Sequence, residues 1–419
     1  MGLFQKKKAA IERAKLEQTH EIICLYCFRN FDHNQVLFRA SHNMDIAGRH
    51  AEIDRPLDEY RALFNMCSVG ELPPVLNPED FSEKYKGYLR GILSSLRDKH
   101  GNLTTARLCP YCHNDITPSA GFAPGTIISI VGASQAGKTA YLTSLIHTLR
   151  NVTTLNFEIF CTPMTNEMGR KFKYEYEAPL IEKGYLPAAV KKGRQQEPLV
   201  FTLSFADESK PEVNIAFFDP LEGMADSIYT DIYASLIRNS SAVMFMVDPQ
   251  QFHAIGHKVQ ILSRLDYDAY AITEPSQVLG SLVENYIYKQ PSGISHIPTA
   301  VVLTKTDLLE ALSYEGDYIR PKSSVFSRYV HRGYFNLTVA EIINNDVDEF
   351  IQRVDPNFRN ALKRRFANLG FFAVSALGTH PDMIHQRVAG FAPVRVDEPF
   401  LWLLYKLGYI DGYDEGIRL

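Results

Sequence analysis

Residues 132–139 read GASQAGKT, so two glycines, a lysine and a threonine fall at the spacing of a phosphate-binding loop. The glycines let backbone N–H groups turn toward a phosphate, and the lysine ammonium reaches the β and γ phosphates of a nucleotide. The threonine that ends such a loop holds Mg²⁺. We therefore predict that phosphates and Mg²⁺ bind to one segment, made of Gly132, Ala133, Ser134, Gln135, Ala136, Gly137, Lys138 and Thr139.

The elements expected around this loop support the assignment. The continuous apolar run Ile127–Val131 predicts a buried strand that ends at the loop, and Lys138–Leu149 predicts a helix that begins there. The helix adds the positive end of its dipole to the site. Lys138 is also a candidate catalytic residue, because its charge neutralises the γ phosphate. The alternative is a plain strand-to-helix turn, which the order of strand, loop and helix disfavours.

The acidic segment DPLEG, residues 219–223, follows the predicted strand Val213–Phe218. At the end of a strand, Asp219 would hold Mg²⁺ through a water molecule, and Gly223 would offer its N–H to the γ phosphate. Between them, Glu222 is a candidate for orienting the attacking water. An aspartate at a strand end is common, so the assignment of this segment depends on the phosphate-binding loop described above.

Two further polar segments follow predicted buried strands. TKTD, residues 304–307, follows Thr299–Leu303, and SAL, residues 375–377, follows Phe371–Val374. Asp307 would accept hydrogen bonds from the N1 and amino groups of guanine while the Lys305 stem covers the ring, and SAL would place backbone N–H groups near guanine O6. The alternative for TKTD is a polar turn in which Asp307 caps the next helix. The predicted base-contacting residues are Thr304, Lys305, Asp307, Ser375, Ala376 and Leu377.

In this order, GASQAGKT, DPLEG, TKTD and SAL resemble the guanine-nucleotide motifs of the TRAFAC class of P-loop GTPases. Together with the zinc-ribbon-like N-terminus, the segments FFAVSALG and VDEPFLWLLYKLG look most like bacterial double-GTPase-type domains of multi-gene conflict or signalling systems. The resemblance covers about residues 120–410. It implies a Mg²⁺-dependent switch that binds GTP and GDP, hydrolyses GTP and couples its nucleotide state to a protein partner.

The chain departs from small GTPases in two places. Gly223 lies one position later than their γ-phosphate glycine, and Met224 stands where they carry the water-orienting glutamine. We therefore expect slow hydrolysis without an activating partner. Two alternatives stay open: a GTP-bound scaffold that does not hydrolyse, and a P-loop ATPase in which TKTD is only a helix cap.

Four of the six cysteines form two Cys-x-x-Cys pairs, Cys24 with Cys27 and Cys109 with Cys112. Four thiolates close a tetrahedral structural Zn²⁺ site, so we predict a zinc ribbon split by the long insertion 28–108. The alternatives are two unrelated turns or a redox pair. We expect the module to dock a protein, because the insertion lacks clustered Lys and Arg with interleaved aromatics and nucleic acid is therefore disfavoured.

After a turn-rich linker at 117–125, apolar strands, among them the predicted buried strand Ala242–Val247, alternate with amphipathic helices. This pattern predicts an α/β fold of the P-loop GTPase type, with a mostly parallel sheet and helices on both faces. Alternation in 199–205, followed by Val213–Phe218, predicts an antiparallel hairpin at one sheet edge. The expected units are an N-terminal helical tail at 1–20, the split zinc ribbon at 21–118 and the G domain at 122–412.

The composition narrows the class of protein further. The chain has 419 residues and a formal net charge of -4, which gives no general attraction to nucleic acid or anionic lipid. No run approaches the ~20 apolar residues of a spanning helix, and the start MGLFQKKKAA lacks the apolar core of a signal peptide. We expect a cytoplasmic protein. Its oligomeric state and the identity of its partner do not follow from the sequence.

Overall fold

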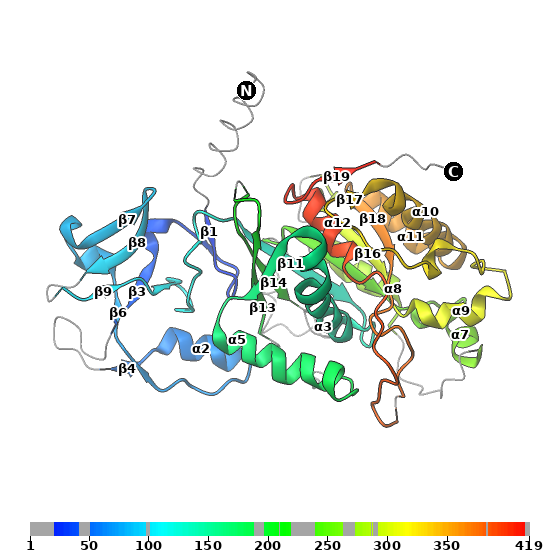
Figure 1. Cartoon of the computed structure of the whole chain (residues 1–419), viewed down its shortest axis with the longest axis horizontal. Coiled ribbons are helices and arrows are strands. Elements are labelled where there is room, and N and C mark those ends of the chain that lie inside the picture. The colour runs from blue at the N-terminus through cyan, green and yellow to red at the C-terminus, as the bar shows by residue number, and fades with distance from the viewer. Residues whose placement is uncertain are drawn as a thin grey trace, which may run out of the picture.

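The computed structural model describes residues 21–41, 51–97, 101–187, 197–208, 210–218, 239–262, 273–285, 287, 292–382 and 384–414. Its larger part is built on a mixed, mostly parallel sheet of seven strands (Figure 1). In spatial order the strands are β12 (Ile159–Pro163), β13 (Leu199–Phe205), β14 (Val213–Phe218), β11 (Gly125–Gly132), β15 (Ala242–Val247), β16 (Thr299–Leu303) and β18 (Leu369–Ala373).

The strands pair as the sequence patterns predict. β14, β11, β15, β16 and β18 run parallel, so their carboxyl ends lie at one edge of the sheet. β13 and β14 form the predicted antiparallel hairpin, with Leu199 opposite Phe217, but the predicted place of this hairpin at the sheet edge is wrong, because β12 pairs with the outer side of β13. β15 and β16 have the predicted bounds, whereas β11 is longer than predicted. The antiparallel edge strand β12 was not predicted.

Both faces of the sheet centre are covered, because consecutive residues of β15 and β16 are all buried. The longest of the covering helices, α10, packs on β18, while α12 contacts β16 and α8 contacts β11. A fold with a mostly parallel sheet and covering helices is thus confirmed. The described α-helices of this part are α3 (Lys138–Thr148), α4 (Thr154–Phe157), α5 (Asn166–Lys171), α7 (Gly256–Leu262), α8 (Pro275–Asn285), α9 (Leu309–Ser313), α10 (Leu337–Val354), α11 (Pro356–Arg365) and α12 (Glu398–Lys406).

Between α3 and β13 the chain forms two π-helical stretches, η4 (Leu149–Thr153) and η5 (Phe172–Glu182). The predicted helix Lys138–Leu149 therefore ends as α3 at Thr148 and continues directly as η4. Short 3-10 helices and one two-stranded ladder complete this part: η6 (Pro249–Gln251), η8 (Thr306–Leu308), η9 (Ser324–Phe326), β17 (Phe335–Asn336) and β19 (Gly412–Tyr413).

The described residues of the N-terminal module, 21–118, form small antiparallel sheets, one α-helix and short 3-10 helices, drawn in blue and cyan in Figure 1. The predicted tail at 1–20 lies outside the described residues. The helix is α2 (Arg55–Leu63), capped by Asp54, whose side chain accepts a hydrogen bond from the N–H of Leu57. The strands are β1 (Ile22–Ile23), β2 (Asn30–Phe31), β3 (Leu37–Arg39), β4 (Glu52–Ile53), β5 (Glu71–Leu72), β6 (Val75–Leu76), β7 (Lys86–Leu89), β8 (Ile92–Arg97), β9 (Leu103–Thr104) and β10 (Arg107–Leu108), with 3-10 helices η1 (His33–Gln35), η2 (Pro78–Asp80) and η3 (Glu83–Tyr85).

This module covers one face of the sheet at β13, β14 and β11. Alternate residues of these strands point into the core of the module, while their neighbours point into the main core. The four that face the module are Ile127, Val200, Ala216 and Phe218. The period of two in a strand explains the division, because successive side chains leave on opposite faces. The cysteine module and the sheet therefore share one continuous hydrophobic cluster.

The linker between the two parts is held from both sides. Arg107 Nη2 donates hydrogen bonds to the carbonyls of Thr117, Pro118 and Ala120. On the sheet side, Asn214 of β14 donates to the Ser119 hydroxyl at 3.0 Å. Within the described residues, no helix is both long and apolar enough to span a bilayer.

Candidate functional site

The predicted phosphate loop joins the carboxyl end of β11 to the first turn of α3. Gly137 has a φ of 84° and caps the helix in the left-handed conformation, which favours glycine. Gly132 is needed for a different reason: an added Cβ would lie 2.7 Å from the Met246 carbonyl oxygen of the neighbouring strand β15. Gly137 thus allows the turn into α3, and Gly132 allows the close approach of the loop to β15.

Lys138 lies inside this loop. Its ammonium group donates hydrogen bonds of 3.0 Å to the carbonyl oxygens of Gly132 and Ala133, and the residue is 9% exposed. The charge is therefore held against the loop backbone at the end of the sheet where ligands of open α/β folds bind. Phosphate oxygens offer this ammonium a better acceptor than carbonyl oxygens, because they carry negative charge.

TKTD reaches the phosphate loop directly. The buried Thr304 hydroxyl donates to the Ala136 carbonyl oxygen at 3.0 Å. Lys305 has a left-handed φ of 50°, and its Cε lies 3.8 Å from the position that a Cβ on Gly137 would take. The lysine stem thus passes beside the end of the phosphate loop, and its predicted role as a cover for the base stays a prediction.

A residue that the sequence analysis did not single out, Asp248, contacts this lysine. Lys305 Nζ lies 2.5 Å from Asp248 Oδ2, and the aspartate side chain is 3% exposed. Nearby, Gln251 Nε2 donates to the Ser134 carbonyl oxygen at 2.6 Å. Asp248 directly follows the buried strand β15. This position at a strand end is the sequence feature that could have identified it as a site residue.

The predicted segment SAL contacts TKTD and the helix that follows the phosphate loop. The Ser375 hydroxyl donates to Asp307 Oδ1 at 2.6 Å and accepts a hydrogen bond from the Gly378 N–H at 2.9 Å. The Ala376 carbonyl oxygen accepts a 2.7 Å hydrogen bond from Ser144 of α3. The helix that begins at the phosphate loop thus also fixes the predicted base loop.

The loop after SAL folds back toward the same place. Leu377 packs with Leu180 and Val388 in a small cluster that includes the half-buried Ala140 of α3. His380 lies on this loop, and burial lowers the pKa of its imidazole below the usual value. The charges of Asp307 and Lys305 act on that pKa in opposite directions.

Asp219, Glu222 and Gly223 lie outside the described residues, so their predicted roles stay predictions. The last residue before them, Phe218, ends β14 and pairs in parallel with Ser129 of β11. The last described residue of β14 therefore lies toward the same sheet edge that carries the phosphate loop.

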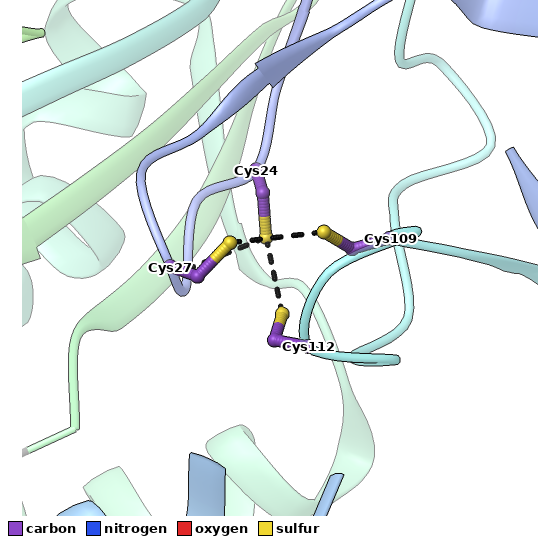
Figure 2. Close-up of side chains that lie close together, drawn as sticks. All are labelled: Cys24, Cys27, Cys109 and Cys112. Atoms are coloured by element: carbon purple, nitrogen blue, oxygen red, sulfur yellow. Dashed lines mark hydrogen bonds between the residues drawn. The ribbon is translucent and has the colours of Figure 1, made fainter. Parts of the chain in front are cut away.

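The four paired cysteines form a second site. Their sulfur atoms all lie within 4.8 Å of one another although the pairs are far apart in the chain, and Figure 2 shows the four side chains pointing at one centre. The Cys24–Cys112 and Cys27–Cys109 sulfur distances are 3.6 and 3.7 Å. Zn²⁺ with Zn–S bonds of ~2.3 Å requires tetrahedral sulfur–sulfur edges of about 3.8 Å. The arrangement fits zinc and is too wide for a disulfide.

The surroundings of the sulfurs suit thiolates around a cation. N–H groups donate to them: Cys27 N to Cys24 Sγ at 3.5 Å, Tyr111 N to Cys109 Sγ at 3.4 Å, and Asn114 Nδ2 to Cys112 Sγ at 3.3 Å. Burial raises the pKa of the Cys24 thiol, whereas hydrogen bonds from Cys112 and Cys24 lower the pKa of Cys109. Four thiolates this close need a divalent cation, and four protein ligands leave it no open position.

Residues 126–375, more than half of the chain, match the family model described as Double-GTPase 2. No curated protein matches the chain. The GTP-bound GTPase-like domain of S. cerevisiae Ski7 aligns at 13% identity and a TM-score of 0.31, over 69% of this chain and about half (51%) of that one. The small GTPase Arl6 (BBS3) of Trypanosoma brucei, with a bound nucleotide analogue, aligns at 13% identity and a TM-score of 0.30, over 69% and 100%.

Proposed function

This chain belongs to the Double-GTPase 2 family, and on that premise we propose that it is a Mg²⁺-dependent switch that binds GTP and GDP and hydrolyses GTP. The observation that carries the proposal is the direct contact between the predicted phosphate and base segments. Thr304 bonds to the phosphate loop and Ser375 bonds to Asp307. Segments that read the two ends of a nucleotide must be held at a constant separation, and these bonds supply that constraint.

Guanine is the base that suits this site. Its N1–H and exocyclic amino group present two donors on one edge, and a carboxylate accepts both. Adenine offers no such pair of donors along that edge. The rival proposal of a P-loop ATPase required Asp307 to act only as a helix cap, yet Asp307 begins no capped helix: η8 has Lys305 at its N-cap position and no side-chain cap. The contact with Ser375 instead supports a role in base recognition.

We propose that hydrolysis is slow in the isolated protein. Lys138 and the N–H groups of the loop would stabilise charge on the phosphates, and Thr139 with Asp219 would hold Mg²⁺, which would supply further positive charge to the phosphates. Glu222 is the proposed water-orienting group, because Met224 and not a glutamine directly follows Gly223. A protein partner that completes the site would raise the rate, as an activating factor does for other GTPases.

In this proposal Zn²⁺ is held by Cys24, Cys27, Cys109 and Cys112 and has a structural role. The N-terminal module passes the nucleotide state to a protein partner, because it is docked on the strands that lead to the nucleotide site. A GTP-bound scaffold that does not hydrolyse is the second candidate, and it shares the same binding geometry.

Parallel titrations with fluorescent GTP, GDP and ATP analogues, in Mg²⁺, test the binding proposal. We expect GTP and GDP to bind and ATP to bind at least ~100-fold more weakly, the scale at which a site with buried polar groups rejects a base that cannot pair with them. Multiple-turnover phosphate release then separates the switch from the scaffold. If protein that binds GTP releases phosphate no faster than buffer alone, the scaffold proposal holds and the switch proposal fails.

A further inference from the structure

Phe28 directly follows the second cysteine of the first pair and is fully buried. Its backbone is left-handed, with a φ of 60°, and its N–H donates to the Cys24 carbonyl oxygen at 2.9 Å. A left-handed φ is unfavourable for a large side chain, so the surrounding turn must impose it. The turn is the one that carries Cys24 and Cys27, and the position of the Phe28 ring therefore depends on the cysteine site.

The Phe28 ring leaves the module and packs on the sheet. It meets the Phe218 ring edge to face, with centroids 5.4 Å apart and planes at 72°. Phe218 is the last residue of β14 and lies opposite Ser129 of β11. Aromatic pairs of this geometry are favourable beyond the area that they bury. The cysteine turn is thus anchored to the end of a strand at the nucleotide edge.

The carbonyl group of Phe28 makes a second contact with the sheet. Asn239 Nδ2 donates to the Phe28 carbonyl oxygen at 2.5 Å. The next residue, Ser240, shares a 2.6 Å hydroxyl–hydroxyl hydrogen bond with Ser129, and both are buried. Ser129 lies on β11, which ends at Gly132 in the phosphate loop. Phe28 therefore contacts both Phe218 and Asn239, the described residues on either side of positions 219–238. Through Ser240, which follows Asn239, this path extends to Ser129 of β11.

We infer that the zinc site and the nucleotide site are energetically coupled through Phe28. The inference rests on the proposed GTP binding and extends it, because it makes Phe28 a positioning residue for the end of β14 and, through Asn239 and Ser240, for β11. Zinc fixes the turn that holds Phe28, and Phe28 fixes Phe218 and Asn239. Because each ligand orders the same Phe28 contacts, we expect positive coupling. Coupling is reciprocal in binding free energy, so bound nucleotide should make the protein bind zinc more tightly, and bound zinc should make it bind nucleotide more tightly by the same factor.

The test measures zinc loss rather than catalysis. Full-length protein, loaded with zinc and Mg²⁺, is mixed with excess of a zinc-selective chelator that leaves Mg²⁺ in solution, with and without a non-hydrolysable GTP analogue. We expect the analogue to slow zinc loss by ~5-fold or more, the lower end of typical coupling between sites. The Phe28→Ala variant should lose zinc at the same rate with and without the analogue.

Phe31→Ala is the matched control, because Phe31 is equally buried and its ring packs on Tyr111 within the module. It should keep the effect of the analogue even where its zinc loss is faster overall. Asn239→Asp removes the amide donor to Phe28 without a cavity, and it should reduce the effect at least two-fold. Equal zinc loss in parent protein with and without bound analogue would overturn the coupling, and so would a full effect in both Phe28→Ala and Asn239→Asp.

A separate titration of the parent protein with the analogue distinguishes the two claims. Parent protein that binds no GTP analogue contradicts the proposed function itself. Parent protein that binds the analogue but shows no protection of zinc leaves the proposed function intact and contradicts the coupling alone.

Discussion

The Ser375 hydroxyl donates a 2.6 Å hydrogen bond to Asp307 Oδ1 across 68 positions of sequence. It ties the segment after β18 to the segment after β16, and these two strands are neighbours in the sheet. An ionised carboxylate has about four acceptor positions, so one bond from Ser375 leaves capacity for both donors of a guanine edge. The hydroxyl orients the carboxylate, and an oriented carboxylate is what recognition of a planar base requires.

Replacing Lys138 by alanine should lower GTP turnover at least ~100-fold, because one preorganised charge on the phosphates is lost. Tm should stay within a few degrees of the parent value, because the bonds from the ammonium to the Gly132 and Ala133 carbonyl oxygens lie within one loop. Lys363→Ala, a change of an exposed lysine on α11, is the control and should leave turnover unchanged. Parent-like turnover in a folded Lys138→Ala variant would show that this loop does not bind the phosphates.

The double variant Cys24→Ser and Cys27→Ser should contain no zinc, against one Zn²⁺ per chain in the parent, because two of four thiolates are gone. The N-terminal module should become sensitive to protease, since binding of a structural metal contributes to folding free energy. Elemental analysis and limited proteolysis are the measurements. The exposed Cys67, outside the cluster, provides the control Cys67→Ser. Parent protein purified without chelators and found to lack zinc would contradict this site.

Asp248→Asn removes the buried countercharge of Lys305 and should weaken GTP and GDP binding alike by about 10-fold, or ~1.4 kcal/mol. The two nucleotides share the base and differ in the γ phosphate, so equal losses locate the defect at the base end. Asp317→Asn, at an exposed ion pair with Lys258, is the matched control. A loss confined to GTP would mean that Asp248 acts on the phosphates.

The pH dependence of stability can be predicted for Glu177, whose pKa is lowered by a hydrogen bond from His147 and by the charge of Arg150. A carboxylate with a lowered folded pKa stabilises the protein above its unfolded pKa of ~4.3 and loses this contribution as the pH falls through the folded pKa. Glu177→Gln should therefore cost about 1 kcal/mol at pH 7, with the difference from the parent shrinking below pH ~4. A constant difference in free energy of unfolding from pH 7 to 3 would contradict the ion-pair origin.

Much of the fold follows from the sequence because the central strands are buried on both faces. Continuous apolar runs predicted β15 and β16 with the bounds that the structure has, and the alternation of apolar with smaller or polar residues predicted β13. β12 was missed because only part of this short edge strand is buried, with Phe160 and Thr162 exposed, and it lies in a stretch without a clear period. The π-helix η5 has no recognisable sequence period of its own, and it contains Pro179.

The sites divide in the same way. The cysteine pairs were identified by chemistry despite a separation of 82 to 88 positions, since thiolate pairs imply a metal whatever the insertion between them. Asp248 was missed because an aspartate after a strand is common, and only its contact with Lys305 distinguishes it. Phe28 carries no chemical signal at all, and its importance arises from packing between two parts of the chain.

The central claim is that Asp307 reads guanine, and nucleotide affinity of Asp307→Asn tests it most directly. Xanthine keeps the N1 hydrogen but has a carbonyl oxygen in place of the amino group, so it presents one donor and one acceptor, which an amide side chain matches. We predict that the variant binds GTP more weakly by ~2–3 kcal/mol and xanthosine triphosphate more tightly than the parent does, while Asp317→Asn changes neither affinity. Parent-like GTP binding without any gain for the xanthine nucleotide would show that Asp307 does not contact the base.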